Sequence, residues 1–144
     1  MLRNKHLRIV VDANCWISSL LSPAFQVRLN VVFDRKYRLL CSEKLFRELD
    51  RAVSKPYPAK RIVRVEYDEL IFRLRTDAEL VDVHSEVDVC RDPKDNYLLA
   101  LAKDGNADYL ITGDTDLLVL KKFGETKFIN MSEFEIRHKP CESF

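Results

Sequence analysis

Residues 7–12 are Leu7-Arg8-Ile9-Val10-Val11-Asp12, a short β-branched run that ends in an acid. Such a run is typical of a buried strand whose polar residue emerges at its carboxyl end. Short apolar runs expected as further strands follow at residues 37–41, 80–83, 109–112 and 127–129. Helical patterns lie between them. This alternation predicts an α/β fold made of right-handed βαβ units, with a parallel sheet covered by helices on both faces.

The expected helices have recognisable starts and stops. Ser22-Pro23 and Ser42 provide a capping residue before an apolar stripe, and the stripe after Ser42 stops at the turn Pro56-Tyr57-Pro58. A further amphipathic helix is expected over residues 62–74. Asp92-Pro93 opens a helix over residues 97–103 that stops at Gly105, and residues 117–122 are expected to form a short helix.

The composition indicates one domain in a reducing compartment. A chain of 144 residues, 47% hydrophobic, is long enough to bury a core without disulfides. We expect the domain to span residues 1–137 and a loose tail to begin at His138. The four cysteines form no metal-binding or disulfide pattern. Neither a signal peptide nor a membrane span is recognisable, so a cytoplasmic location is expected.

The net charge bounds the kind of partner. With a formal charge of only +1, the chain has no overall basic field, so any nucleic-acid site must be a local patch. Residues 51–64 form such a patch, with Tyr57 as a ring on which a base could stack. Its cations are Arg51, Lys55, Lys60, Arg61 and Arg64. A plain solvated surface is the competing interpretation of this segment.

Two acids directly follow expected strands. Asp12 follows the first strand and Asp114 the fourth. If these strands are neighbours in a doubly wound sheet, the two acids converge where ligands bind in such sheets. Carboxylates are the ligands that Mg²⁺ and Mn²⁺ prefer, and two such ions can drive an in-line displacement at a phosphodiester. The competing interpretation of Asp12 is a strand-end acid bound by backbone amides, and Asn14 could either orient Asp12 or fix the turn.

Other acids have strong structural explanations. Asp92 is placed to cap a helix, whereas Asp95, in the first turn, can both stabilise that helix and face the mouth of the sheet. At least one of Asp114 and Asp116 is explained as a cap of the short helix that follows. Glu48 and Asp50 lie on opposite borders of the apolar face of one expected helix. Helical periodicity therefore does not decide which of the two acids points into a site.

Four segments, in order and spacing, resemble the PIN domain family, and in particular the VapC-like toxin components of prokaryotic toxin-antitoxin pairs. The resemblance covers nearly the whole chain. The segments are Val10-Val11-Asp12-Ala13-Asn14, Ser42-Glu43-Lys44-Leu45-Phe46-Arg47-Glu48-Leu49, residues 91–102 from Arg91-Asp92-Pro93-Lys94-Asp95-Asn96 onward, and residues 107–118 around Thr112-Gly113-Asp114-Thr115-Asp116.

The resemblance implies a three-layer α/β/α fold with a five-stranded parallel sheet in the order 3-2-1-4-5. It also implies that the metal-binding and catalytic acids are Asp12, Glu48, Asp95 and Asp114, with Asp116 as an auxiliary metal ligand and Asn14, Thr112 and Asp92 in support. The resemblance thus favours Glu48 over Asp50. Lys94 departs from the family pattern, since related chains often carry another acid there.

The sequence therefore predicts a Mg²⁺- or Mn²⁺-dependent endoribonuclease, and the resemblance adds a homodimer inhibited by a small antitoxin protein. A PIN-fold RNA-processing or scaffold module without a toxin role is the first alternative. A receiver-like phosphoacceptor domain is the second, but such a domain needs a phosphorylated acid after its third strand, where this chain offers only Asp82.

Overall fold

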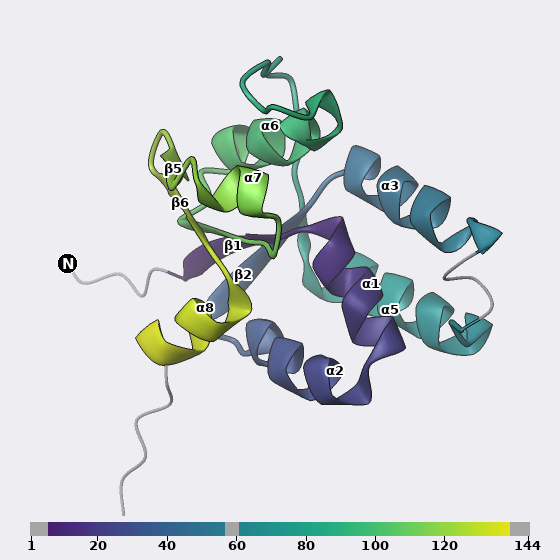
Figure 1. Cartoon of the computed structure of the whole chain (residues 1–144). Coiled ribbons are helices and arrows are strands. Elements are labelled where there is room, and N and C mark those ends of the chain that lie inside the picture. The colour runs from purple at the N-terminus through teal and green to yellow at the C-terminus, as the bar shows by residue number, and fades with distance from the viewer. Residues whose placement is uncertain (1–5, 57–60, 139–144) are drawn as a thin grey trace, which may run out of the picture.

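The computed structural model describes residues 6–56 and 61–138, and its centre is a six-stranded sheet in the order β3-β2-β1-β4-β6-β5. The parallel strands are β1 (Leu7–Val11), β2 (Tyr37–Cys41), β3 (Glu79–Leu80), β4 (Tyr109–Ile111) and β6 (Thr126–Ile129). Counted along the chain, β6 is the fifth of these parallel strands, so their order in the sheet is the predicted 3-2-1-4-5. Figure 1 shows α6 (Asn96–Asp104) above this sheet, and α2 (Pro23–Leu29) and α8 (Met131–Arg137) below it.

A short antiparallel strand makes the sheet mixed rather than purely parallel. Strand β5 (Lys122–Phe123) pairs with β6 at one edge, whereas the sequence predicted that a helix would continue to Lys122. The helix, α7 (Thr115–Leu118), ends earlier. Lys121 and Gly124 both have positive φ, which reverses the chain on either side of β5 and allows the hairpin to form.

The remaining helices include two that the sequence analysis missed. Helix α3 (Glu43–Val53) follows its predicted cap, Ser42. Helix α5 (Arg64–Asp77) corresponds to the expected helix over residues 62–74, with both ends shifted by two or three residues. Short 3₁₀ turns, η1 (Asn30–Phe33) and η2 (Pro93–Asp95), extend α2 and precede α6. The missed helices are α8 and α1 (Ala13–Leu21). Most of α1 is buried, so its apolar residues do not mark one face.

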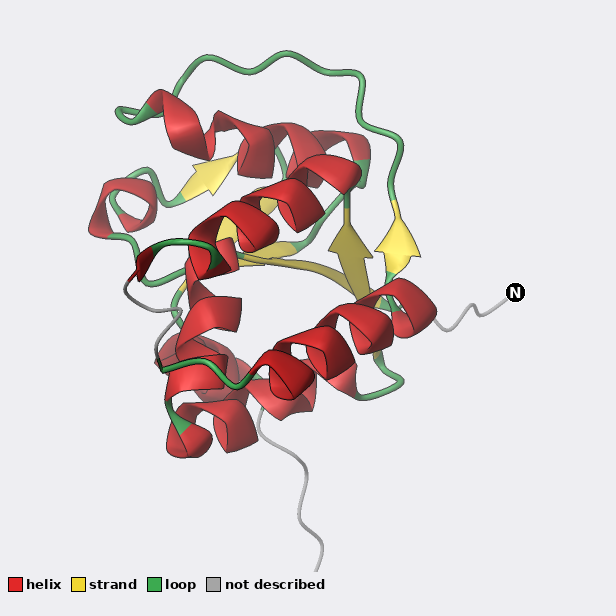
Figure 2. Ribbon diagram, turned by 90° about the vertical axis from the view of Figure 1, so that its right-hand side faces the viewer, coloured by secondary structure: helices red, strands yellow, loops and turns green. Residues whose placement is uncertain are grey.

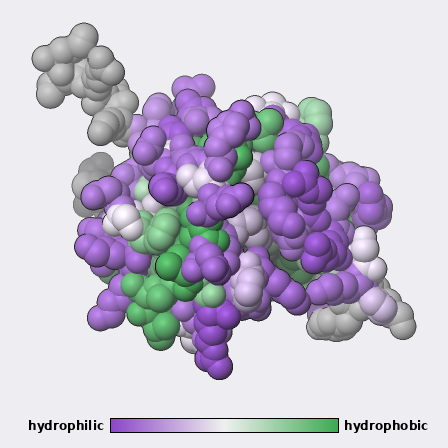
Figure 3. Space-filling view, turned by 90° about the horizontal axis from the view of Figure 1, so that it is seen from above, coloured by the Kyte–Doolittle hydropathy of each residue, from purple (hydrophilic) through white to green (hydrophobic). Residues whose placement is uncertain are grey.

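The core explains why β1 is central. Ile9, Val10 and Val11 are consecutive and at most 1% exposed, which requires helices over both faces of the sheet. Leu98, Leu99 and Leu101 of α6 belong to the same fully buried core. The surface seen from above is by contrast largely hydrophilic, with an apolar patch on one side (Figure 3). Within the described residues, no helix is both long and apolar enough to cross a bilayer.

The carboxyl ends of β1 and β4 lie side by side. Val10 is paired with Leu110 and Val11 with Ile111, so Asp12 and Thr112 come next on adjacent strands. A long loop, residues 81–92, connects β3 to η2 and crosses the molecule in Figure 2. Near its start, Arg8 of β1 holds β3 through two hydrogen bonds to Glu79, at 2.8 and 3.1 Å. The fold therefore brings the segments that carry the predicted acids to one edge of the sheet.

Gly105 closes α6 where no side chain fits. A Cβ there would lie 2.8 Å from Leu40 Cδ1 and 3.0 Å from the Leu101 carbonyl oxygen, and Leu40 is 1% exposed. We expect Gly105→Ala to lower the free energy of unfolding by about 1–3 kcal/mol in urea titrations, because the packed core must shift. Gly113→Ala is the control, since a Cβ at Gly113 meets no atom within 4 Å. Equal stability of the two variants would contradict this account of Gly105.

Candidate active site

Asp12 is fixed by hydrogen bonds to both of its carboxylate oxygens. Its Oδ1 accepts from the backbone N–H of Asn14 at 3.1 Å and so caps α1, and its Oδ2 accepts from Thr112 Oγ1 at 2.7 Å. The side chain is 3% exposed. Burial raises the pKa of Asp12, the nearby charge of Asp114 adds to the rise, and the two hydrogen bonds oppose it. Asp12 therefore binds a backbone amide, as the competing interpretation of this acid predicted, and is also a member of a carboxylate cluster.

Thr112 connects Asp12 to Asp114. Its hydroxyl donates to Asp12 and accepts from the backbone N–H of Asp114 at 3.0 Å, and the residue is completely buried. Asp114 then caps α7, because its Oδ1 accepts from the backbone N–H of Asp116 at 2.9 Å. The supporting position predicted at Thr112 therefore orients two of the predicted acids at once.

Asp95 reaches Asp114 from the other side of the site. A hydrogen bond between the two carboxyl groups favours the protonated form of Asp95. Burial, the hydrogen bond with Asp114 and the charges of Asp114 and Asp12 raise the pKa of Asp95 to about 7. Asp12, Asp95 and Asp114, which come from three distant segments, thus share one electrostatic environment.

Glu48, on α3, faces this environment, whereas Asp50 does not. The charges of Asp12, Glu48 and Asp95, after burial, raise the pKa of the Tyr97 phenol, so Tyr97 lies in the field of all three. The Glu48 side chain is 17% exposed and forms ion pairs with Lys44 at 2.9 Å and Arg51 at 3.5 Å. Asp50 is exposed and accepts from the Tyr67 hydroxyl. The structure therefore separates the two acids that periodicity could not.

The remaining predicted acids and Asn14 lie around this cluster. Asp92 is exposed and caps η2 through Lys94 N–H at 3.0 Å, as predicted. Asp116 is partly exposed, and its Oδ1 is 3.5 Å from Arg91. Asn14 is exposed and supports Asp12 through its backbone N–H.

The arrangement suits a divalent cation in its chemistry, although it is not a closed metal centre. Carboxylates with raised pKa values repel one another, and a cation among them would relieve that repulsion and lower those pKa values. Within residues 6–56 and 61–138, however, no three His, Cys, Asp or Glu side chains lie close enough together to hold a metal ion as they stand. Glu48 is paired with Lys44 and Arg51, so its carboxylate already has cationic partners from the protein.

The basic patch predicted over residues 51–64 is partly engaged within the protein. Arg51 pairs with Glu48, and Arg64 pairs with Asp68 at 3.1 Å and lies over the Tyr67 ring. Lys55 and Arg61 are exposed. Lys60 and Tyr57 lie outside the described residues.

Several residues near the acids were not singled out from the sequence. Asn96 Oδ1 accepts from the backbone N–H groups of Val89 and Cys90, at 3.2 and 2.9 Å, and so ties the loop of residues 81–92 to α6. Burial and the charges of three acids raise the pKa of the Cys90 thiol to about 11. Lys44 precedes Glu48 by four residues, so helical spacing alone could have identified it.

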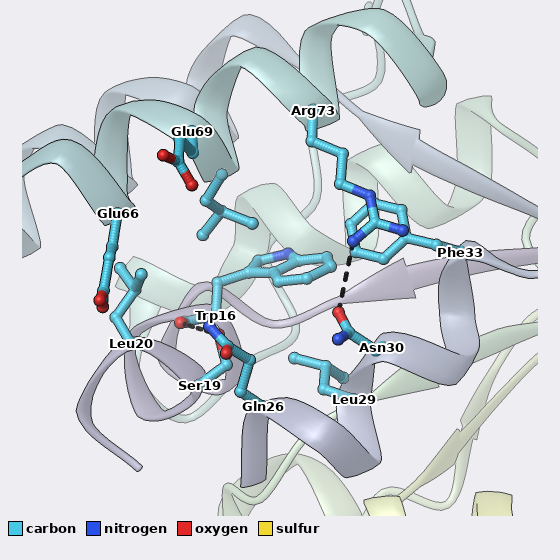
Figure 4. A pocket seen from close by; sticks show the side chains of 11 residues that line it. Trp16, Ser19, Leu20, Gln26, Leu29, Asn30, Phe33, Glu66, Glu69 and Arg73 are labelled. Carbon is cyan, nitrogen blue, oxygen red and sulfur yellow. Dashed lines mark hydrogen bonds between the residues drawn. The ribbon is translucent and has the colours of Figure 1, made fainter. Parts of the chain in front are cut away.

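Two hollows among the described residues lie away from the acids. A cavity of about 310 Å³ lies between α1, α2 and α5 (Figure 4), where the buried indole N–H of Trp16 has no hydrogen-bond partner. A wider one of about 1260 Å³ is lined by Arg8, Arg38 and the β5–β6 turn, near the amino ends of β1 and β2. None of the predicted site acids lines either hollow.

The raised pKa of Asp95 predicts a pH-dependent stability in EDTA. The folded protein binds more protons than the unfolded chain between 3.8, the usual pKa of an aspartate, and the folded value of about 7. Stability should therefore fall as the pH rises through this window, with the loss complete above about pH 7. Urea midpoints measured from pH 5 to 8 should decline less steeply for Asp95→Asn than for the wild type. Identical slopes would show that Asp95 does not carry the effect.

Thr112 should matter for cation binding through the two acids that it orients. We expect Thr112→Val to weaken Mn²⁺ binding by about 10–100-fold in calorimetry, because groups that orient ligands have effects of this size. Thr112→Ser keeps the hydroxyl and should bind nearly as the wild type. Thr126→Val is the matched control, since Thr126 is 3% exposed and donates to the Ala107 carbonyl, away from the acids. Equal losses in the Thr112→Val and Thr126→Val variants would indicate a general folding defect instead.

Comparisons with known proteins agree with this geometry. The family model described as "PIN domain" matches residues 8–116. A solved structure described as VapBC2 from Rickettsia felis, bound to a DNA fragment from their promoter, matches with a TM-score of 0.58 and 14% sequence identity, over 86% of this chain and 98% of that chain. At this identity the structural match shows a likeness of fold alone. A search of curated proteins found no significant match.

The family model spans more than half of the chain and includes Asp12, Glu48, Asp95 and Asp114, the acids that the sequence analysis selected. The sheet order around β1 and β4 is the one that the resemblance implied. The chain belongs to the PIN domain family.

Proposed function

We propose that this protein is a metal-dependent endoribonuclease in which Asp12, Asp95 and Asp114 hold Mg²⁺ or Mn²⁺, with Glu48 completing the site directly or through water. The observation that carries the proposal is the contact between the Asp95 and Asp114 carboxyl groups, joined to Asp12 by the Thr112 hydroxyl. Family membership supports nuclease chemistry for these acids.

The donor set fits such an ion because it consists of carboxylate oxygens, and one or two carboxylates per ion leave positions open for water and phosphate. When bound, the ions would supply an activated water and neutralise charge on the phosphodiester. The protein's contribution is to hold the ligands. Thr112 and the α1 cap fix Asp12 before any substrate arrives, so little reorganisation is needed.

Two kinds of cationic side chain lie near the acids: those that pair with Glu48 and those that are exposed to a substrate phosphate. Lys44 and Arg51 pair with the Glu48 carboxylate and restrict the positions that its side chain can take. Arg91 has an 84% exposed side chain beside Asp116, and Lys94 is exposed in η2. Both can approach a phosphate without leaving a buried partner unpaired.

We further propose that the protein is the toxin of a toxin-antitoxin pair, acting in the cytoplasm as a homodimer inhibited by a small antitoxin. The likeness in fold to the VapBC2 structure supports this role, and Asp116 then serves as an auxiliary acid. Expression should arrest growth, and co-expression of a neighbouring gene product should relieve the arrest. Growth unaffected by expression of an active nuclease would favour housekeeping RNA processing.

A scaffold module that retains the acids is the second candidate, and the ion pairs of Glu48 with Lys44 and Arg51 favour it. These pairs already satisfy one acid without a metal. Calorimetry separates the two candidates, because a scaffold is expected not to bind Mn²⁺ at millimolar concentration.

Asp114→Asn should lower the rate of Mn²⁺-dependent RNA cleavage by more than about 100-fold, since the loss of a ligand should exceed the effect of a group that only orients one. Asp68→Asn removes a carboxylate from the exposed face of α5 and should leave the rate unchanged. Cleavage of a labelled oligoribonucleotide by rigorously purified protein measures both. Equal activity of the Asp114→Asn variant and the wild type would refute the assignment.

A further inference from the structure

Two lysines face each other across the edge of the sheet. Lys122 of β5 and Lys127 of β6 are directly paired in the antiparallel ladder, and both are exposed. Directly opposite residues have Cβ atoms about 4.5–5.5 Å apart, and like charges in such a pair destabilise the sheet. Lys121, with φ of 66°, adds a third exposed ammonium group next to them. We call Lys121, Lys122 and Lys127 the lysine edge.

The residues that the structure describes do not neutralise these charges. Across the described residues, no carboxylate oxygen lies within 4.0 Å of any of the three ammonium groups, and Glu125, in the turn between β5 and β6, forms no ion pair with them. The contrast with the predicted basic patch is direct, because Arg51 and Arg64 both have acidic partners. The three ammonium groups are therefore available to an anionic partner from outside the chain.

The lysine edge is connected to the carboxylates by a short apolar stretch. Asp114 caps helix α7, and after the helix the chain passes through Val119 and Leu120, 72% and 41% exposed, to reach Lys121. Lys127 is paired with Tyr109, three residues before Thr112, so its backbone lies about 10 Å from the level of Thr112 along the strand direction. A single nucleic-acid strand of a few nucleotides spans this distance.

We propose that the lysine edge binds the phosphate backbone of single-stranded RNA that enters or leaves the carboxylate site, with Val119 and Leu120 contacting sugars or bases. This inference rests on the proposed ribonuclease function and assigns the path of its substrate. A site made of acids repels a polyanion, so cations within a few nucleotides are needed to retain the strand. The exposed aliphatic side chains suit unpaired nucleotides, whose bases are accessible.

The test measures RNA binding and folding stability in the same variants. A labelled single-stranded oligoribonucleotide is titrated with the Asp114→Asn protein, which should bind without cleaving, at several salt concentrations. Changing both Lys122 and Lys127 to Thr should weaken binding at least tenfold and make the slope of log K against log salt shallower by about 1.4, for two lost phosphate contacts. The Tm of each single Lys→Thr variant should be unchanged or higher, because the repulsion is removed.

Arg35→Thr is the matched control, since it removes an exposed cation from the loop between η1 and β2. An unchanged slope in the double variant, or an equal loss of affinity in the control, would overturn the inference. Polyglutamate bound as tightly as RNA would also overturn it, in favour of an acidic protein partner. Cleavage by the wild-type enzyme is assayed separately, so a protein that cleaves RNA but does not use the lysine edge disproves only this inference.

Discussion

The hydroxyl group of Thr112 is the constraint on which the site depends. It is completely buried between β1 and β4, donates to Asp12 and accepts from the backbone of Asp114. A hydroxyl has one proton to give, so its orientation is fixed by these two partners. The pairing of β1 with β4 places Thr112 and Asp12 at the same level, and the turn after Thr112 then starts α7. The register of β1 and β4, the start of α7 and the positions of the two carboxylates therefore all depend on Thr112.

The carboxylates are brought together against their mutual repulsion. The charge of Asp114 raises the pKa of both Asp95 and Asp12, and Asp12 is buried. The surrounding fold must offset this cost, and it does so with helix caps, with the Thr112 hydrogen bonds and with the large core under α6. Glu48 is the exception, because Lys44 and Arg51 balance its charge locally. Among the described residues, Asp12, Asp95 and Asp114 thus form no ion pair, whereas Glu48 forms two.

The sequence predicted the features that depend on local patterns. Ser42, Asp92 and the β-branched run at residues 7–12 define elements that the structure confirms. Helix α1 was missed because burial on most sides removes the periodicity of Ala13–Leu21. Strand β5 was missed because its formation depends on the positive φ of Lys121, which no propensity of lysine predicts. Likewise, periodicity could not choose between Glu48 and Asp50, since only tertiary packing directs Asp50 to Tyr67.

Strand β5 also affects how the folded molecule behaves at high concentration. A sheet edge offers unpaired N–H and C=O groups to the strands of other molecules, and proteins limit this with very short edge strands and with lysine side chains. Strand β5 consists of Lys122 and Phe123 alone, and the positive φ of Lys121 and Gly124 turns the backbone away at both ends. The ladder of β1, β4 and β6 is thereby closed to intermolecular β-pairing on this side, which should protect the protein from edge-to-edge aggregation.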